Sequence, residues 1–489
     1  MSLATDLGTR FKAELTSQSV STISGALLIY GLARLLEPND YGLLFLAISA
    51  FSIASIFSKL GLSKSAARYI TDYRERNPGQ LPYIIKVAFI FNSITIAIVA
   101  FVFLTGHEFI AVWIGEPKLA PLLALGVFFI TFETLTKFTR RIAQGFEDIY
   151  LAAIILILDR GGRLFFAIGL ILLGYNIIGA LIGYIVASAI ASLFGLIAIY
   201  YKFYTTIPPA DAIEEGLTRR ILEYNVPLTI TGLSGKVDKE LDTILVGLFL
   251  NPISVSYYVL GKQIISFVQM PATALGFSIS PTYGKQKASG ELFIAAKMFE
   301  RSFIYTLLLY VPAAVGILLI AEPTVEIIFG ESYTGAVPVL QVFSIFVVLS
   351  SITNITDYPL DFLGRAKSRA IAKGIASISN VVLNILLIPT VGVVGAAIAT
   401  VITHSFYVLV KIFIISSELP LDINRVVPEL TKIAFVSISM GVPIWAFSHQ
   451  ITGIFTLTFI VLLGIIIWAS LSILTGLIDR KEFRVTLDL

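Results

Sequence analysis

Residues 362–400, FLGRAKSRAIAKGIASISNVVLNILLIPTVGVVGAAIAT, decide the fold. The stretch begins with a short basic segment, continues as an apolar run over residues 370–388, turns at a proline and a glycine, and starts a second apolar run at Val393. A helix of about 20 residues rises about 30 Å, which is the thickness of the hydrocarbon core of a bilayer. We therefore interpret both runs as membrane-spanning helices joined by a tight turn.

The same alternation of apolar runs and short polar connections continues along the whole chain of 489 residues. Hydrophobic residues make up 56% and charged residues only 14% of it, against roughly 25% charged in soluble proteins. The pattern predicts an all-α polytopic membrane protein with about fourteen spans. The predicted spans are residues 19–36, 42–62, 83–105, 119–138, 149–173, 177–201, 225–250, 253–279, 303–321, 336–356, 370–388, 393–416, 430–447 and 454–474.

Composition also excludes several kinds of chemistry. The chain has no cysteine, which excludes disulfides and thiolate ligands, and its three histidines are too far apart in the sequence to suggest a metal site. The net charge of +3 is spread over many short loops, so no nucleic-acid partner is indicated. A phosphate-binding GxxxxGK[ST] loop is absent, and we expect no direct use of ATP and no cofactor.

The charges of the loops predict the orientation of the spans. Lysines and arginines gather in alternate loops, whereas the loops between them hold Lys118 and little else. Short basic loops stay in the cytoplasm, so we expect both termini to be cytoplasmic and the protein to lie in the cell membrane. No cleaved signal is recognisable before the first span, which we expect to act as the targeting signal.

The two halves of the chain echo each other. The segment GALIG at Gly179 matches GAAIA at Gly395, and LGLS at Leu60 matches LGFS at Leu275. Six predicted spans separate equivalent points, and an even number gives both halves the same orientation. We predict two pseudo-symmetric six-helix lobes plus two C-terminal helices. The predicted boundaries are 1–203 for the first lobe, 204–223 for a cytoplasmic linker, 224–416 for the second lobe, and 417–489 for the last two spans and a cytoplasmic tail.

The predicted span over residues 225–250 carries five charges at its centre. Each costs about 2.5–3.5 kcal/mol in the middle of a membrane helix, so they cannot face lipid. Their spacing allows pairs within the helix, and the alternative is that they line a hydrated cavity. The five residues are Lys236, Asp238, Lys239, Glu240 and Asp242.

Further charges lie in other predicted spans. Asp159 and Arg163 are four residues apart and can pair, which would leave Arg160 as an unpaired cation. Guanidinium groups bind phosphate through two parallel hydrogen bonds, so this pair of arginines would suit a diphosphate or an acidic sugar. The alternative is that they extend to cytoplasmic headgroups. Lys262 is a further buried cation, which either lines a cavity or has a local partner.

Two carboxylates near predicted cytoplasmic edges have basic residues four positions later. Glu133 is expected to pair with Lys137, and Asp361 with Arg365. Both are interpreted as interfacial ion pairs rather than proton sites.

Several stretches resemble the Wzx-type polysaccharide and oligosaccharide flippases of the multidrug/oligosaccharidyl-lipid/polysaccharide (MOP) exporter superfamily. They are ARLLEPNDYGLLFLAIS at residues 33–49, KLGLSKSAARYI at 59–70, LDTILVGLFLNPISVSYYVLGKQI at 241–264 and the stretch 362–400 quoted above. The resemblance implies two lobes that alternate between inward-open and outward-open states, like those of MATE transporters. It also implies a non-enzymatic flippase that moves an oligosaccharide on polyprenyl phosphate or diphosphate to the outer leaflet, for surface polysaccharide or glycoprotein glycan assembly. Asp242 and Lys262 fall where the family often has an acid and a base.

These observations lead to a hypothesis for the site. Five basic residues would bind the phosphate or acidic sugars, namely Arg160, Arg163, Lys236, Lys239 and Lys262. Four acids would balance their charge or couple transport to H⁺ or Na⁺, namely Asp159, Asp238, Glu240 and Asp242. The expected partners are the lipid-linked oligosaccharide, membrane lipid and glycan-assembly enzymes, and the expected state is a monomer.

Two other functions remain open. A cation-coupled multidrug antiporter of the same superfamily would share the fold, but its cavity should be net acidic and aromatic. An integral-membrane glycosyltransferase or polymerase would need a large outer loop with catalytic acids, and the predicted outer loops are short.

Overall fold

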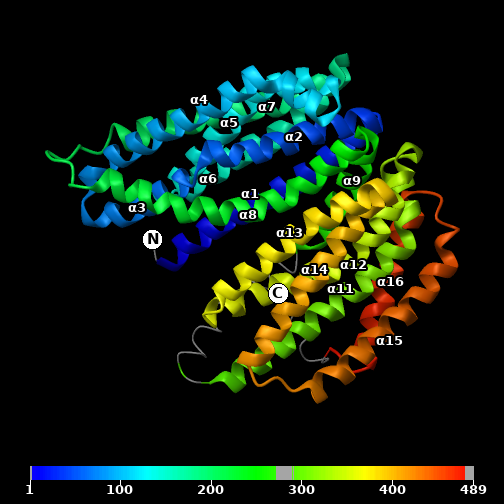
Figure 1. Ribbon diagram of the computed structural model, residues 1–489. Coiled ribbons are helices and arrows are strands. Elements are labelled where there is room, and N and C mark those ends of the chain that lie inside the picture. Colours follow the sequence, from blue (N-terminus) through cyan, green and yellow to red (C-terminus); the bar gives the residue numbers. More distant parts are fainter. Residues whose placement is uncertain (1–2, 271–288, 290, 479–489) are drawn as a thin grey trace. The chain divides into compact units, whose positions relative to one another are not determined.

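The computed structural model describes residues 3–270, 289 and 291–478, with the side chains of most of them. Every regular element in these ranges is helical, which confirms the all-α polytopic prediction (Figure 1). The chain forms two compact units, Met1–Ile253 and Ser254–Leu489. Each is described by itself, and the lobe and linker boundaries expected from the sequence stay predictions.

Ten helical segments of the described ranges are long and apolar enough to cross a membrane. One of them, Ile149–Tyr204, consists of two helices that pack along each other and are separated by Gly174 in the left-handed region. Two further helices have 33 residues each, about 50 Å at 1.5 Å per residue, but carry more charge. The total of fourteen spans stays a prediction.

The described part of the first unit contains eight α-helices and a few short 3₁₀ and π segments. α2 begins with Pro38 in its first turn and ends where Leu60 and Gly61 take positive φ angles of 37° and 73°, so α3 leaves in a new direction. α3 is short and amphipathic, with basic residues on its exposed side. The bounds are α1 Leu3–Leu35, α2 Pro38–Lys59, α3 Leu62–Arg76, α4 Leu81–Ile114, α5 Ala120–Gly145, α6 Ile149–Leu170, α7 Asn176–Ile199 and α8 Leu217–Phe249.

Small residues on α7 allow α5 and α6 to approach it closely. They recur every four residues, as Gly179, Gly183, Ala187, Ala191 and Gly195. A Cβ atom on Gly183 would lie 2.3 Å from the backbone nitrogen of Ala167 on α6, and one on Gly195 would lie 2.5 Å from the Thr139 hydroxyl on α5. Such stripes drive helix association in membranes, where apolar side chains gain nothing by leaving lipid. The close contact brings polar side chains of α6 and α7 together.

The connection between α7 and α8 is fastened to α3 and the turn that follows α3. The backbone N–H of Ala210 donates to the Gly79 carbonyl at 2.9 Å, and the Gln80 amide donates to the Ala212 carbonyl at 2.7 Å. The carboxylate of Glu214 accepts hydrogen bonds from the Tyr73 hydroxyl at 2.6 Å and from Arg220 at 2.8 Å. The segment that the sequence predicts as a linker is therefore held by unit 1.

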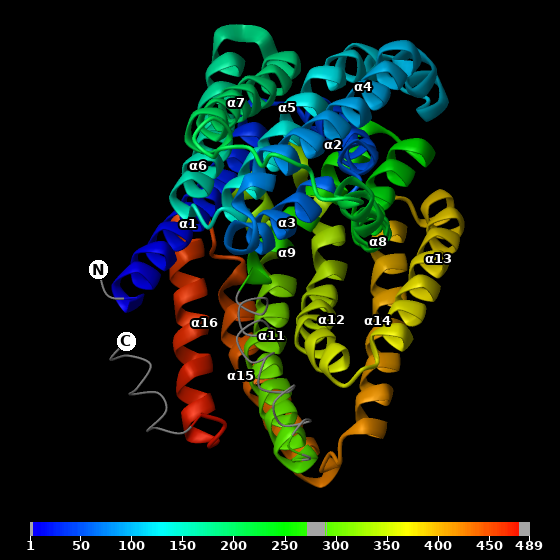
Figure 2. The ribbon, with the colours of Figure 1, turned by 90° about the vertical axis from the view of Figure 1, so that its left-hand side faces the viewer.

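The second unit contains seven described helices. The stretch quoted at the outset forms α13 and α14, which run side by side as the expected helical hairpin (Figure 2). The chain turns at Gly392, and a Cβ atom on Gly395 would lie 2.3 Å from the Leu387 carbonyl oxygen. The bounds are α9 Pro252–Val268, α11 Leu292–Ile328, α12 Val337–Phe362, α13 Ala366–Val391, α14 Val393–Glu418, α15 Ile423–Ser448 and α16 Ile454–Leu474.

Candidate functional site

A buried charged network joins α6 to α7 in unit 1. Asp159 and Arg163 are only 5% and 6% exposed, and two nitrogens of Arg163 lie 3.0 and 2.9 Å from Asp159 Oδ1. Ser188 on α7 closes the triangle, since its hydroxyl donates to Asp159 Oδ1 at 2.9 Å and accepts from Arg163 at 3.1 Å. The pairing of Asp159 with Arg163, expected from their spacing, is confirmed.

Arg160 is not the unpaired cation that the spacing suggests. Its Nε lies 3.6 Å from Asp159 Oδ2, because the carboxylate presents one oxygen to each arginine. That contact is an ion pair and is too long for a hydrogen bond. The side chain of Arg160 is 43% exposed, whereas that of Arg163 is 8% exposed, so Arg160 is the more accessible guanidinium.

A second carboxylate extends the network to α2 and α5. Glu133 binds Lys137, one turn further along α5, as predicted, and its other oxygen lies 3.4 Å from the ammonium of Lys59 on α2. Lys59 also donates to the Ser55 hydroxyl at 2.9 Å. The negative charge of Glu133 also acts electrostatically on both arginines of α6.

These side chains form a basic cluster, defined as Lys59, Glu133, Lys137, Asp159, Arg160 and Arg163. Among these six residues, four cations accompany two carboxylates, a difference of two positive charges. Aromatic rings support Arg163, whose guanidinium carbon lies 5.2 Å from the ring centroid of Tyr184 and 5.9 Å from that of Phe129. A net positive, partly accessible cluster inside an apolar bundle can bind an anion.

The charged stretch on α8 is only partly described. The side chains of Lys236 and Asp238 lie outside the described residues. Lys239 is exposed, Asp242 is 6% exposed, and the Glu240 carboxylate accepts a hydrogen bond from Ser49 on α2 at 2.9 Å. α8 therefore contacts α2 through a polar side chain.

Lys262 belongs to the other unit. It lies on α9, is half-buried, and its ammonium is 5.9 Å from the ring centroid of Tyr258, one turn earlier. Tyr258 is a partner within the same helix, which is one of the two alternatives that the sequence left open for Lys262. Among the predicted site residues, the structure thus assembles Asp159, Arg160 and Arg163 into one network, and the assignment of the others to the same site stays a prediction.

Unit 2 contains a buried charged group that sequence reasoning missed. Lys411 on α14 is fully buried, donates to Asp357 on α12 at 3.0 Å, and reaches the Thr353 carbonyl at 3.3 Å. Its ammonium also lies 4.3 Å from the ring centroid of Tyr407. Lys411 falls within the predicted span 393–416, so the free-energy argument applied to residues 236–242 could have found it, whereas Asp357 lies one residue beyond the predicted span 336–356.

The predicted pair of Asp361 and Arg365 is wrong. Asp361 binds Arg369 at 3.0 Å, and Arg365 donates to Glu418 at 2.7 Å. The spacing rule holds only within one helix, whereas α12 ends at Phe362 and α13 begins at Ala366. Arg369 also lies 3.5 Å from Asp357, which joins it to the Lys411 pair.

A profile of the family described as polysaccharide biosynthesis protein matches residues 13–287, more than half of the chain. The chain belongs to this family. A second profile, MatE, matches residues 227–386 of the chain. The predicted membership of the MOP superfamily is confirmed, and the fold class with it.

Named relatives are flippases. The probable low-salt glycan biosynthesis flippase Agl15 of Haloferax volcanii is 25% identical over 41% of this chain and 42% of its own length. The lipid II flippase MurJ of Bacillus subtilis is 23% identical over 54% of this chain and 53% of its own length. The matches therefore span about half of each relative. These names denote transporters, in line with the prediction that the protein is not an enzyme.

Solved structures share the fold. A lipid II flippase MurJ in an inward closed conformation superposes with a TM-score of 0.74 at 17% identity, over 94% of this chain and 98% of that one. An inward-facing multidrug resistance MATE transporter gives a TM-score of 0.68 at 16% identity, over 82% and 95%.

Proposed function

We propose that the protein is a flippase that moves an oligosaccharide linked to polyprenyl phosphate or diphosphate from the cytoplasmic to the outer leaflet. The glycan would serve surface polysaccharide or glycoprotein glycan assembly, and the protein would work by alternating access. A hydrophilic glycan cannot cross hydrocarbon unaided, because each polar group without a hydrogen-bond partner costs several kcal/mol. The families, the flippase relatives and the basic cluster all support this function.

The basic cluster is the single observation that carries the proposal. Its two excess positive charges match a phosphate or diphosphate, and guanidinium geometry allows two parallel hydrogen bonds to such a group. Arg160 would make the first contact because its side chain is the more accessible of the two arginines. Arg163, held by Asp159 and Ser188, would orient the network. Lys236, Lys239 and Lys262 would extend the anionic path, and Asp238, Glu240 and Asp242 would balance charge or couple H⁺ or Na⁺.

The cation-coupled multidrug antiporter is the weaker alternative. A MATE transporter shares the fold, but a cationic drug would meet repulsion at a cluster with an excess of positive charge. The excess therefore favours the anionic cargo.

Transport can be measured with the purified protein in proteoliposomes that contain a fluorescent lipid-linked oligosaccharide. Arg160→Gln should lower the flipping rate about tenfold or more, since a hydrogen bond to a charged group contributes about 1.5–3 kcal/mol. Arg219→Gln is the matched control, because that arginine is 82% exposed on the first turn of α8 and pairs only with Glu223 in the described contacts. An unchanged rate for the folded Arg160 variant would refute the role of the cluster.

We further propose that the protein lies in the cell membrane with both termini in the cytoplasm, works as a monomer and meets glycan-assembly enzymes there. The absence of native cysteine provides a ready background for labelling. A cysteine at Arg219 should react with a membrane-impermeant maleimide only after the cells are opened, and one at Lys118 should react in intact cells. The reverse pattern would overturn the orientation.

A further inference from the structure

Two hydroxyl-bearing residues of α7 contact Arg163 of the basic cluster. Tyr184 and Ser188 are one turn apart, so they lie on the same face of the helix. The Ser188 hydroxyl accepts a hydrogen bond from Arg163 at 3.1 Å, and the ring centroid of Tyr184 lies 5.2 Å from the Arg163 guanidinium carbon. α5 fixes this turn of α7, since the Thr136 hydroxyl donates to the Ser188 carbonyl at 2.9 Å. Helix packing therefore holds Tyr184 beside the cluster.

The Tyr184 hydroxyl has no hydrogen-bond partner among the described residues, although the residue is only 7% exposed. Buried tyrosines usually have one, as Tyr73 does when it donates to Glu214 at 2.6 Å. In the described structure, the Tyr184 hydroxyl is also not one of the unpartnered polar atoms that are sealed from solvent, as Nδ2 of Asn92 is. Part of this hydroxyl is therefore accessible.

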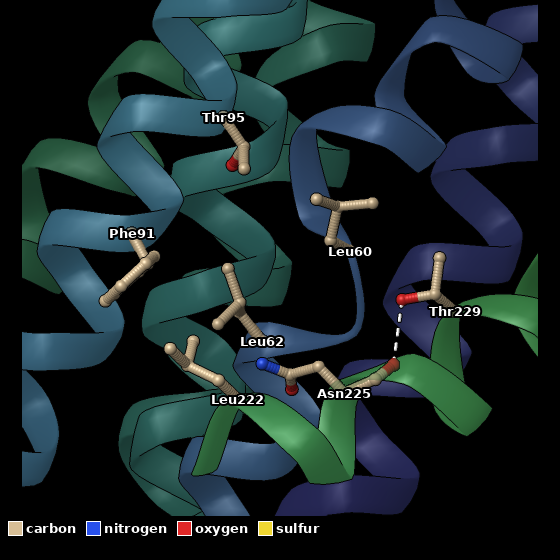
Figure 3. Close-up of a pocket in the computed structure, with 7 residues that line it drawn as sticks. All are labelled: Leu60, Leu62, Phe91, Thr95, Leu222, Asn225 and Thr229. Atoms are coloured by element: carbon tan, nitrogen blue, oxygen red, sulfur yellow. Dashed lines mark hydrogen bonds between the residues drawn. The ribbon is translucent and has the colours of Figure 1, made fainter. Parts of the chain in front are cut away.

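An apolar pocket of about 300 Å³ in the same unit offers a comparison (Figure 3). Its lining residues, none of which belongs to the basic cluster, are Leu60, Leu62, Phe91, Thr95, Leu222, Asn225 and Thr229. The Thr229 hydroxyl donates to the Asn225 carbonyl at 2.8 Å, and the Thr95 hydroxyl donates to two backbone carbonyls at 2.6 and 2.9 Å. These hydroxyls are bonded to the backbone, whereas that of Tyr184 is left for a ligand.

The two arginines of α6 also keep donors that no described group accepts. Arg163 donates from Nε to Asp159 and from Nη2 to Ser188, but Nη1 makes no hydrogen bond to a described residue and is not sealed from solvent. The one ion pair of Arg160 in the described structure is its 3.6 Å contact with Asp159, and its side chain is 43% exposed. Tyr184 interacts electrostatically with both arginines. Donors from three side chains therefore lie in one place without an acceptor.

We propose that Tyr184 is a further binding residue of this site, and that its hydroxyl donates to an oxygen of the phosphate or diphosphate held by Arg160 and Arg163. The inference rests on the proposed function and narrows it, because it assigns the cluster to phosphate and not to the carboxylate of an acidic sugar. Arg160 and Arg163 supply the charge, and Tyr184 supplies a neutral donor on the neighbouring helix.

The number of donors favours phosphate over carboxylate. A carboxylate has two oxygens, and one guanidinium occupies both when it binds them through parallel hydrogen bonds. A phosphate group offers further oxygens, so it can accept from a second arginine and from a phenol at the same time. Because the phenol carries no charge, its contribution depends on the geometry of the acceptor. Loss of the hydroxyl should therefore reduce selectivity as well as affinity.

The experiment measures binding to the purified full-length protein in detergent by isothermal titration calorimetry. The ligands are farnesyl diphosphate and farnesoic acid, which has a carboxylate on the same kind of chain. The wild type should bind the diphosphate at least tenfold more tightly. Tyr184→Phe removes only the hydroxyl, and it should lower the affinity for the diphosphate about tenfold and that for the carboxylate less than threefold. A general loss of folding would lower both affinities alike.

Two further variants separate the hydroxyl from the ring. Tyr184→Leu should weaken both ligands, because Arg163 then loses its aromatic support as well. Tyr201→Phe is the matched control, since it makes the same change at an exposed tyrosine in the segment that follows α7, and its binding should equal that of the wild type. Competition by inorganic pyrophosphate would show that the free anion suffices, and its absence would show that the lipid chain is required; Tyr184→Phe should weaken the bound species in either case.

The outcomes distinguish this inference from the proposed function. If Tyr184→Phe keeps the affinity and selectivity of the wild type while Arg160→Gln loses affinity for the diphosphate, the role of the hydroxyl is overturned and the flippase proposal stands. If neither variant changes the binding of the diphosphate, the basic cluster is not the phosphate site, and both proposals lose the observation that carries them.

Discussion

The α6–α7 hairpin of unit 1 and the α13–α14 hairpin of unit 2 are related by the internal repeat but differ in the side chains that they place between helices. Sixteen residues after Gly179, α7 has Gly195, which lets the helix pack against Thr139. Sixteen residues after the matching Gly395, α14 has Lys411, which reaches across to Asp357. The repeat therefore preserves the close helical hairpins and changes the polar groups between them.

The two networks differ in how their cations are held. In unit 2, ion pairs join Lys411 and Arg369 to Asp357 and Asp361, and Lys373 contacts the same Tyr407 ring as Lys411. In unit 1, four cations face two carboxylates, and Arg160 is accessible. A fully buried ammonium such as that of Lys411 suits a structural role, whereas an accessible guanidinium such as that of Arg160 suits an anionic ligand. We therefore expect mutations in unit 2 to affect stability first and those in unit 1 to affect transport first.

The largest expected effect comes from breaking the unit 2 pair. Asp357→Leu leaves the Lys411 ammonium buried without its carboxylate and should lower the free energy of unfolding by about 3–5 kcal/mol. Unfolding of the purified protein by sodium dodecyl sulfate, followed by circular dichroism, measures the change. The double variant Asp357→Leu/Lys411→Met should recover most of the loss, because both charges are then removed. If the double variant is as unstable as the single one, the pair is not what stabilises α12 against α14.

Gly183 in unit 1 and Gly395 in unit 2 test whether close helix packing is the feature that the two units share. Gly183→Ala and Gly395→Ala each place a methyl group 2.3 Å from a backbone atom of the neighbouring helix, and each should cost about 1–3 kcal/mol of unfolding free energy. Gly169→Ala, where a methyl group meets nothing within 4 Å, is the control and should not destabilise the protein. The same unfolding assay applies. A loss in only one unit would show that the two hairpins are not equivalent.

Replacement of Arg160 in unit 1 should affect transport and hardly affect stability, the opposite of what is expected for the Lys411 ion pair in unit 2. Arg160→Gln removes a contact at 3.6 Å from a side chain that is 43% exposed, so the unfolding free energy should change by less than about 1 kcal/mol. Its flipping rate should fall as described above. A destabilisation as large as that of Asp357→Leu would mean that Arg160 is structural, and the functional contrast between the units would fail.

The smallest effect concerns pH and the connection between α7 and α8. Hydrogen bonds from Tyr73 and Arg220 lower the pKa of Glu214 below its ordinary value of 4.5. Burial, followed by the bond to Glu214, raises the pKa of Tyr73, which keeps the phenol protonated as the donor. Because the pKa of Glu214 is lowered in the folded state, its stabilising contribution is present above pH 4.5 and is lost as the pH falls through the lowered value.

Thermal unfolding of the wild type and Glu214→Gln between pH 7 and pH 3 measures this contribution. The difference in midpoint should be small at pH 7 and should close toward pH 3. A difference that stays constant over this range would exclude titration of Glu214 as its cause.

Hydropathy and residue spacing predicted much of the fold and part of the site. Apolar runs identified the helices, because lipid requires each spanning segment to satisfy its own backbone. Pairs within one helix, Asp159 with Arg163 and Glu133 with Lys137, followed from their spacing. Contacts between helices did not, because no sequence rule places Ser188 beside Asp159. Spacing also failed for Asp361, where a helix boundary intervenes.

The fastening of the α7–α8 connection has a mechanical consequence. Ala210, Ala212 and Glu214 are bonded to the segment around Gly79, and the first turns of α8 are tied down as well, since Ser65 donates to the Ile221 carbonyl at 2.9 Å. The first turns of α8 are therefore bound to α3 and should move with it as one piece. A hinge that moves the rest of α8 relative to α3 would have to lie further along the chain, beyond these hydrogen bonds.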